Sequence, residues 1–127
     1  MIKDKDTIRM AIAEIVGEES YIRLRAEDFA EVCPNPAWAV HVTGKDTDDL
    51  LGQLVQELEQ ADGGKLYGTV AYIRTSFTSS LTMSDLARID AMLPCALRRR
   101  KGIAFIPDGA GTEIWFIADE GLINEDI

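Results

Sequence analysis

The stretch DTDDLLGQLVQELEQADGG, residues 46–64, lies at the centre of the fold prediction. Leucine and valine recur in it every three or four residues, with aspartate, glutamine and glutamate between them, which is the pattern of an amphipathic helix. Its opening aspartates suit a helix start and its closing glycines a helix end. A segment with strand alternation precedes it at 38–43, and one rich in β-branched and aromatic residues follows at 66–75. The sequence therefore predicts a strand–helix–strand unit.

Further elements are predicted on both sides of this unit. The spacing Thr82-x-x-Asp85 resembles a capping box and predicts a helix that stops at Pro94. Turn residues at 107–111 separate two apolar segments, which predicts an antiparallel hairpin at the end of the chain. The remaining predictions are a helix over 4–16, a short strand over 21–25, helical turns over 27–32, and hairpin strands over 102–106 and 113–118.

Together these elements predict one acidic α+β domain over residues 1–127. The order after the first helix is β-α-β-α-β-β, and crossovers through helices connect parallel strands. We expect a mixed sheet of four or five strands with helices mainly on one face. A hydrophobic content of 46% with 28% charged residues is ordinary for a globular protein, and the length allows one continuous core.

The charge of the chain is concentrated in one stretch. Residues 14–62 hold twelve carboxylates against Arg23, Arg25 and Lys45, so this stretch sums to 3 − 12 = −9, and the formal charge of the whole chain is also −9. Such an asymmetric field favours basic partners. It also opposes direct binding of nucleic acid, since the attraction to phosphates would be reversed.

No catalytic, cofactor or metal site is predicted. His41 is the only histidine, and Cys33 and Cys95 follow no pairing or metal spacing, so no nucleophile–base pair can be identified. The aspartates at 46–49 lack the glycine and distant glutamate of a calcium loop. We expect no hydrolase or transferase activity of the chain's own. Catalysis by carboxylates alone stays open, because paired acids leave no fixed spacing.

The sequence also predicts a cytoplasmic protein without membrane contacts. Its apolar runs are far shorter than the roughly 20 residues of a membrane-spanning helix. The first residues lack the apolar region of a secretory signal. Two reduced cysteines fit a bacterial-type cytoplasm.

The leading functional hypothesis is a small acidic binding protein that acts by protein–protein contact. It would be an inhibitor or immunity-type protein, bacterial or phage, that docks on a basic and nucleic-acid-binding surface. The residues predicted to bind the partner are Asp46, Asp48, Asp49, Glu57 and Glu59, followed by Glu18 and Glu19.

Two alternatives belong to other classes. One is a module that binds a small molecule or an anion through the Ser/Thr loop 75–82 and the basic run Arg98–Lys101. This alternative includes an enzyme. In a strand these cations would alternate faces, so they would not act as one patch. They would instead pair with the acidic half or guard the strand against edge-to-edge association. The other is a homodimeric acidic chaperone or assembly factor that self-associates through the final apolar strand. The anion-binding candidates are Ser76, Thr78, Ser79, Ser80, Arg98 and Arg100.

Overall fold

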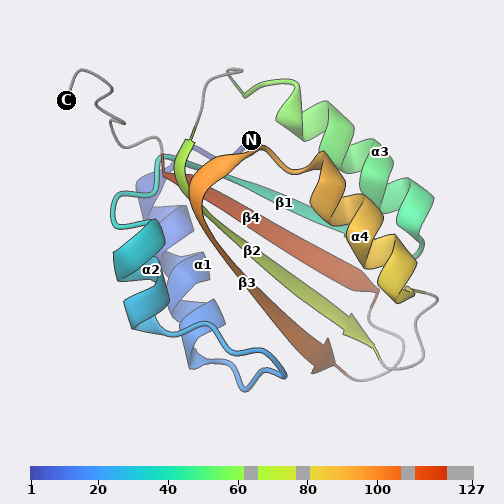
Figure 1. Ribbon diagram of the computed structural model, residues 1–127, viewed down its shortest axis with the longest axis horizontal. Coiled ribbons are helices and arrows are strands. Elements are labelled where there is room, and N and C mark those ends of the chain that lie inside the picture. The colour runs from blue at the N-terminus through green and yellow to red at the C-terminus, as the bar shows by residue number, and fades with distance from the viewer. Residues whose placement is uncertain (62–65, 77–80, 107–110, 120–127) are drawn as a thin grey trace.

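The computed structural model describes residues 1–61, 66–76, 81–106 and 111–119, and these form four helices and a four-stranded mixed sheet (Figure 1). The α+β class is therefore as the sequence predicts. None of the helices in these ranges has the length and apolar composition needed to cross a membrane. In chain order the elements are α1 (Lys5–Gly17), α2 (Ala26–Val32), β1 (Trp38–Gly44), α3 (Thr47–Leu58), β2 (Leu66–Ser76), α4 (Met83–Met92), β3 (Ala96–Ile106) and β4 (Thr112–Asp119).

The strand order β1-β4-β2-β3 corrects the predicted hairpin (Figure 1). β2 and β3 are parallel neighbours joined through α4, as the helical crossover predicts. β4 pairs antiparallel with both β1 and β2, so it lies inside the sheet and is not a neighbour of β3. β3 also begins at Ala96 rather than at 102. Because β4 has a strand on each side, it offers no edge for the self-association proposed from the sequence.

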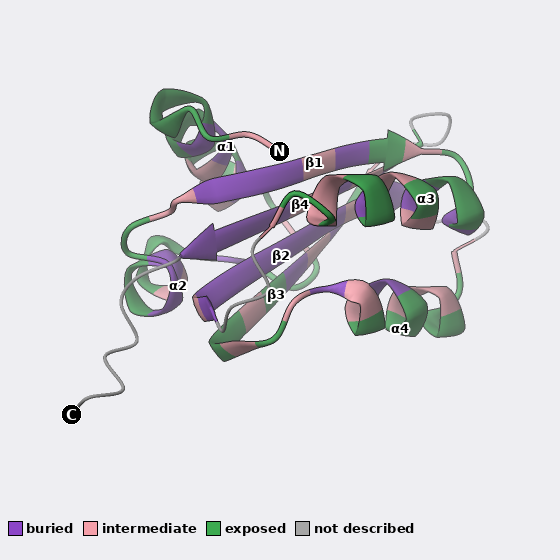
Figure 2. Ribbon diagram, turned by 90° about the horizontal axis from the view of Figure 1, so that it is seen from above, coloured by how far each residue is buried: buried purple, intermediate pink, exposed green. Residues whose placement is uncertain are grey.

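Burial explains why β4 is central and β3 is at the edge. Ile114, Phe116 and Ile117 are each no more than 1% exposed, so β4 is apolar on both faces, as interior strands are. β3 carries the basic run 98–101, which is largely exposed (Figure 2). Placing these cations in the middle of the sheet would strip them of water at high cost. The edge position leaves them hydrated.

Two helices cover each face of the sheet, which corrects the expectation of helices mainly on one face. Ala71 and Ile73 of β2 belong to the core beneath α3 and α4, with Leu50 of α3. Val70 and Tyr72 alternate to the opposite core, beneath α1 and α2. A strand that is apolar on both faces needs cover on both, and the N-terminal helices supply the second layer.

The predicted helix starts are confirmed. Asp46 is the N-cap of α3, and its side chain accepts a hydrogen bond from the backbone N–H of Asp49 at 2.8 Å. Thr82 and Asp85 form a reciprocal capping box at the start of α4, at 3.1 and 2.9 Å. These bonds satisfy backbone donors that a helix start leaves without partners.

Each edge of the sheet carries one isolated bridge to the N-terminal part of the chain. Ile22 pairs antiparallel with Ile103 of β3, and Ile2 pairs with Ala39 of β1. The strand predicted over 21–25 is thus reduced to a single bridging residue, because the chain turns inward at the buried Leu24.

Candidate functional site

The outward side of α3 is an acidic helix surface. Leu50 and Leu54 point into the core, so helical periodicity turns the intervening polar positions toward water. We call Asp48, Asp49 and Glu59 the acidic face; all three are exposed. α3 itself contains no lysine or arginine.

Little neutralises this face within the described part of the chain. Arg88 of α4 lies 3.4 Å from Asp48, whose side chain is 89% exposed, and such an exposed pair contributes little. Within the same ranges, Asp49 and Glu59 form no ion pair. The rise of a helix places Asp48 and Glu59 about 16 Å apart along the axis. A partner must therefore present an extended basic surface to meet both ends.

Two of the predicted partner-binding carboxylates serve the fold as well. Asp46 is exposed, but its side chain is engaged as the α3 cap. Glu57 accepts a hydrogen bond from the amino group of Met1 at 2.7 Å, and its side chain is only 30% exposed. Glu57 is therefore a weaker candidate for a partner than the acidic face.

The other two predicted partner-binding residues, Glu18 and Glu19, differ in their environment. Glu19 is exposed and pairs with nothing in the described ranges. Glu18 turns inward, where it accepts hydrogen bonds from the Tyr72 hydroxyl and from Nε of Arg74 at 2.8 Å. Burial, and then the bond to Glu18, raise the pKa of Tyr72 above its ordinary value. Glu18 is thus a structural residue, which corrects its assignment to the partner surface.

Arg74 is the centre of an ion network beneath α1. Its side chain is 11% exposed and contacts Glu14 at 3.0 Å, Glu18 and Glu113. Burial alone would lower the pKa of Arg74, but its bonds to Glu18 and Glu113 raise it above the ordinary value. Sequence reasoning missed this network. Its one signal is a charged residue near the end of an otherwise apolar strand.

His41 joins the same network from β1. Its Nε2 donates to the Glu113 carboxylate, and its ring stacks on Trp115 at 4.1 Å between centroids. Burial opposes ionisation of Glu113, but hydrogen bonds from His41 and Arg74 hold its pKa below the ordinary value. A histidine held between a carboxylate and an aromatic ring fits a structural role, since no nucleophile among the described residues is bonded to it.

The structure does not bring the anion-binding candidates together. Ser76 pairs with Ile106 in the parallel register, whereas Arg100 pairs with Val70, six residues earlier on β2. Six residues of strand span about 20 Å. Arg98 lies farther still, beside Gly68. Thr78, Ser79 and Ser80 lie outside the described residues.

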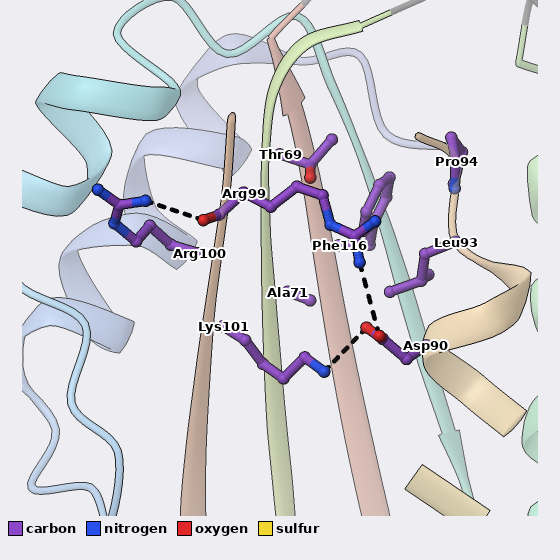
Figure 3. Close-up of a pocket in the computed structure, with 9 residues that line it drawn as sticks. All are labelled: Thr69, Ala71, Asp90, Leu93, Pro94, Arg99, Arg100, Lys101 and Phe116. Carbon is purple, nitrogen blue, oxygen red and sulfur yellow. Dashed lines mark hydrogen bonds and ion pairs between the residues drawn. The ribbon is translucent and has the colours of Figure 1, made fainter. Parts of the chain in front are cut away.

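The basic run alternates faces, as its strand position predicts. On the α2 side, Arg98 and Arg100 meet Glu31 at 3.9 and 2.8 Å, and Arg100 also lies 3.5 Å from Asp28. On the α4 side, Arg99 and Lys101 share a single carboxylate, Asp90, at 3.5 and 2.9 Å (Figure 3). One carboxylate against two cations leaves a local charge of +1 there.

The two cysteines should react very differently. Burial, and then the charge of Asp119, raise the pKa of Cys33 to about 12, while Cys95 is exposed. The raised pKa keeps the Cys33 thiol protonated at pH 8, and the thiolate is the reactive form. We expect iodoacetamide to label one thiol per native chain, at Cys95, and two after denaturation, as counted by intact mass. Rapid labelling of Cys33 in the native protein would contradict this placement.

Comparison with known proteins gives a likeness of fold alone. No protein-family model matches the chain, and no curated protein is significantly similar to it. A solved structure described as "FtsZ dimer, empty (M. jannaschii)" is similar, with a TM-score of 0.51 and 15% sequence identity over 84% of this chain. The likeness covers 34% of that chain, so the present sequence spans about a third of its length.

Proposed function

We propose that this chain is a small cytoplasmic binding protein that docks its acidic face on a basic surface of a partner protein. The observation that carries the proposal is the exposure of Asp49 and Glu59, in the first turn and at the C-cap of a helix without basic residues. A complementary field across an interface acts chiefly on association rate and specificity. An inhibitor or immunity-type role against a nucleic-acid-binding groove suits this charge, because carboxylates along a helix offer the anionic character of a phosphate backbone.

The test begins with the tagged protein as bait in host lysate, followed by purification of the basic protein recovered. Association rates are then measured with the variant D49K/E59K. We expect the rate to fall about tenfold or more, because attraction becomes repulsion and steering contributes factors of that order. Raising the salt concentration should slow wild-type association steeply, since exposed charges are screened over about 8 Å at physiological ionic strength.

The matched control is D6K/E27K, which changes the net charge by the same amount on α1 and α2. Both residues are exposed, and both lie in the first turn of their helices, as Asp49 does in α3. We expect the control to associate within about twofold of wild type, provided that the melting temperatures agree. Normal binding by D49K/E59K would contradict the proposal and exclude the acidic face as the docking surface.

A further inference from the structure

The outer edge of β3 is a second surface with unused binding capacity. In the described ranges only Ile22 pairs with this edge, through reciprocal backbone bonds with Ile103 at 3.0 Å. Backbone groups along a strand alternate in direction, so those of Leu97, Arg99 and Lys101 also face outward. The carbonyl of Arg99 accepts a bond from the Arg100 guanidinium at 3.0 Å. The outward N–H groups of all three residues have no protein acceptor among the described residues.

The opposite edge of the sheet carries the same kinds of bond but is shorter, since β1 has 7 residues and β3 has 11. Ile2 bonds both backbone groups of Ala39 in β1. The amide of Gln53 donates to the carbonyl of Thr43 at 2.6 Å. β3 therefore keeps the longer open stretch, from Leu97 to Lys101, and an unpaired edge is a template for another strand.

The face of β3 that looks toward α4 is open as well. A cavity of about 210 Å³ lies at Asp90, Arg99 and Lys101, and one of about 350 Å³ continues from it past Leu86 and Ile103. Figure 3 shows Arg99 and Lys101 pointing across this space to Asp90, while Arg100 points to the other side of the sheet. This space lies inward of β3, over Thr69 and Ala71 of β2 and Phe116 of β4, and it leaves the side chains of Arg99 and Lys101 uncrowded.

Charge decides which kind of strand fits. Arg99 and Lys101 are 46% and 42% exposed and exceed Asp90 by one charge, in a chain whose total is −9. Two β3 edges paired with each other would set these cations against their own copies, and like charges directly opposite are destabilising. An acidic strand would instead form cross-strand ion pairs. Leu97, on the same face by alternation, is 52% exposed and offers an apolar contact.

We propose that the β3 edge from Leu97 to Lys101 binds an acidic, extended segment of a partner protein by strand addition. Carboxylates would lie opposite Arg99 and Lys101, and an apolar side chain opposite Leu97. The added strand runs antiparallel to β3, as the bridging Ile22 does on the same edge. This surface is independent of the acidic face of α3, which attracts the opposite charge.

The probe is a fluorescein-labelled peptide, Thr-Glu-Thr-Glu-Thr-Val-Thr, titrated into the full chain and followed by fluorescence polarisation. Its two glutamates and valine share one face of a strand and match Lys101, Arg99 and Leu97 in antiparallel order. We expect R99E/K101E to weaken binding about tenfold, since each cross-strand pair turns from attractive to repulsive. The control K5E/R9E changes the same charge at exposed sites on α1 and should bind within about twofold.

Two further measurements guard the test against misfolding and against purely electrostatic adsorption. A peptide with lysine in place of glutamate should leave amide hydrogen exchange at Leu97, Arg99 and Lys101 of the wild-type chain unchanged, even where the acidic face attracts it. Amide hydrogen exchange should slow at Leu97, Arg99 and Lys101 when the acidic peptide is bound, and stay unchanged at His41 in β1. Binding without this protection would overturn strand addition. A dimer of the free protein that R99E/K101E abolishes would assign the edge to a second copy and overturn the proposal.

Discussion

Replacing Gly68 with alanine should lower the unfolding free energy by about 3 kcal/mol, because the added methyl group would overlap with the backbone of Val32. A Cβ atom at Gly68 would lie 1.6 Å from the carbonyl oxygen of Val32 and 2.6 Å from its carbonyl carbon. Both obstacles are backbone, at the end of α2, so no side chain can rotate away. α2 would have to move off the sheet and loosen its buried contacts at Phe29 and Val32.

The measurement is a thermal melt of G68A beside G52A, a glycine-to-alanine change where nothing lies within 4 Å. We expect G68A to melt about 10 °C below wild type, given a few degrees per kcal/mol for a domain of this size. G52A should gain about 0.5–1 kcal/mol, because alanine favours the helix interior of α3. A G68A melting temperature within about 2 °C of wild type would show that α2 does not approach β2 this closely.

The helices and most strands could be predicted because their signals are local. Apolar spacing and capping residues specify α3 and α4 within a few turns of chain. The strand order could not be predicted from local signals. Two strands that follow each other in the sequence, such as β3 and β4, suggest a hairpin, although β2 lies between them in the sheet. A signal was nonetheless present. The basic run at 98–101 is typical of an edge strand, and the apolar run at 114–118 is typical of an interior one.

In the candidate site, too, the features that depend on neighbouring residues could be predicted, and those that depend on distant residues could not. Asp48, Asp49 and Glu59 are exposed as helical periodicity predicts, because their orientation depends only on neighbouring residues. Glu18 and Glu57 are turned toward the protein by Arg74 and the Met1 amino group, each 56 residues away in sequence. No local pattern predicts such a pairing. Among the described residues, Asp49 and Glu59 form no ion pair, and Asp48 pairs only with the exposed Arg88.

Replacing Arg74 should also have a large effect, because this β2 residue joins carboxylates at the end of α1 to Glu113 of β4. Glu18 and Glu113 are 28% and 23% exposed at the side chain, so each is costly to leave without its cation. Methionine fills a similar volume with no charge. Removing one partner of a fully buried pair costs about 3–5 kcal/mol, and the partial burial of this network places its cost at the low end of that range. We expect R74M to lose about 3 kcal/mol of unfolding free energy at pH 7. R9M is the control, because Arg9 is 73% exposed and contacts only Asp6 at 3.7 Å in the described ranges, so its loss should stay within about 0.5 kcal/mol.

The pH dependence of that loss separates an electrostatic network from simple packing. The pKa of Glu113 is lowered in the folded state, so its contribution is complete above the ordinary glutamate value of about 4.3. That contribution disappears as the pH falls through the lowered folded value. In R74M one of the groups that lower the pKa is gone, so less stability is left to lose in acid. Urea unfolding from pH 7 to pH 3 should therefore show the gap between wild type and R74M narrowing below about pH 4. A gap that stays constant across this range would mean that the Arg74 side chain stabilises the protein by packing alone.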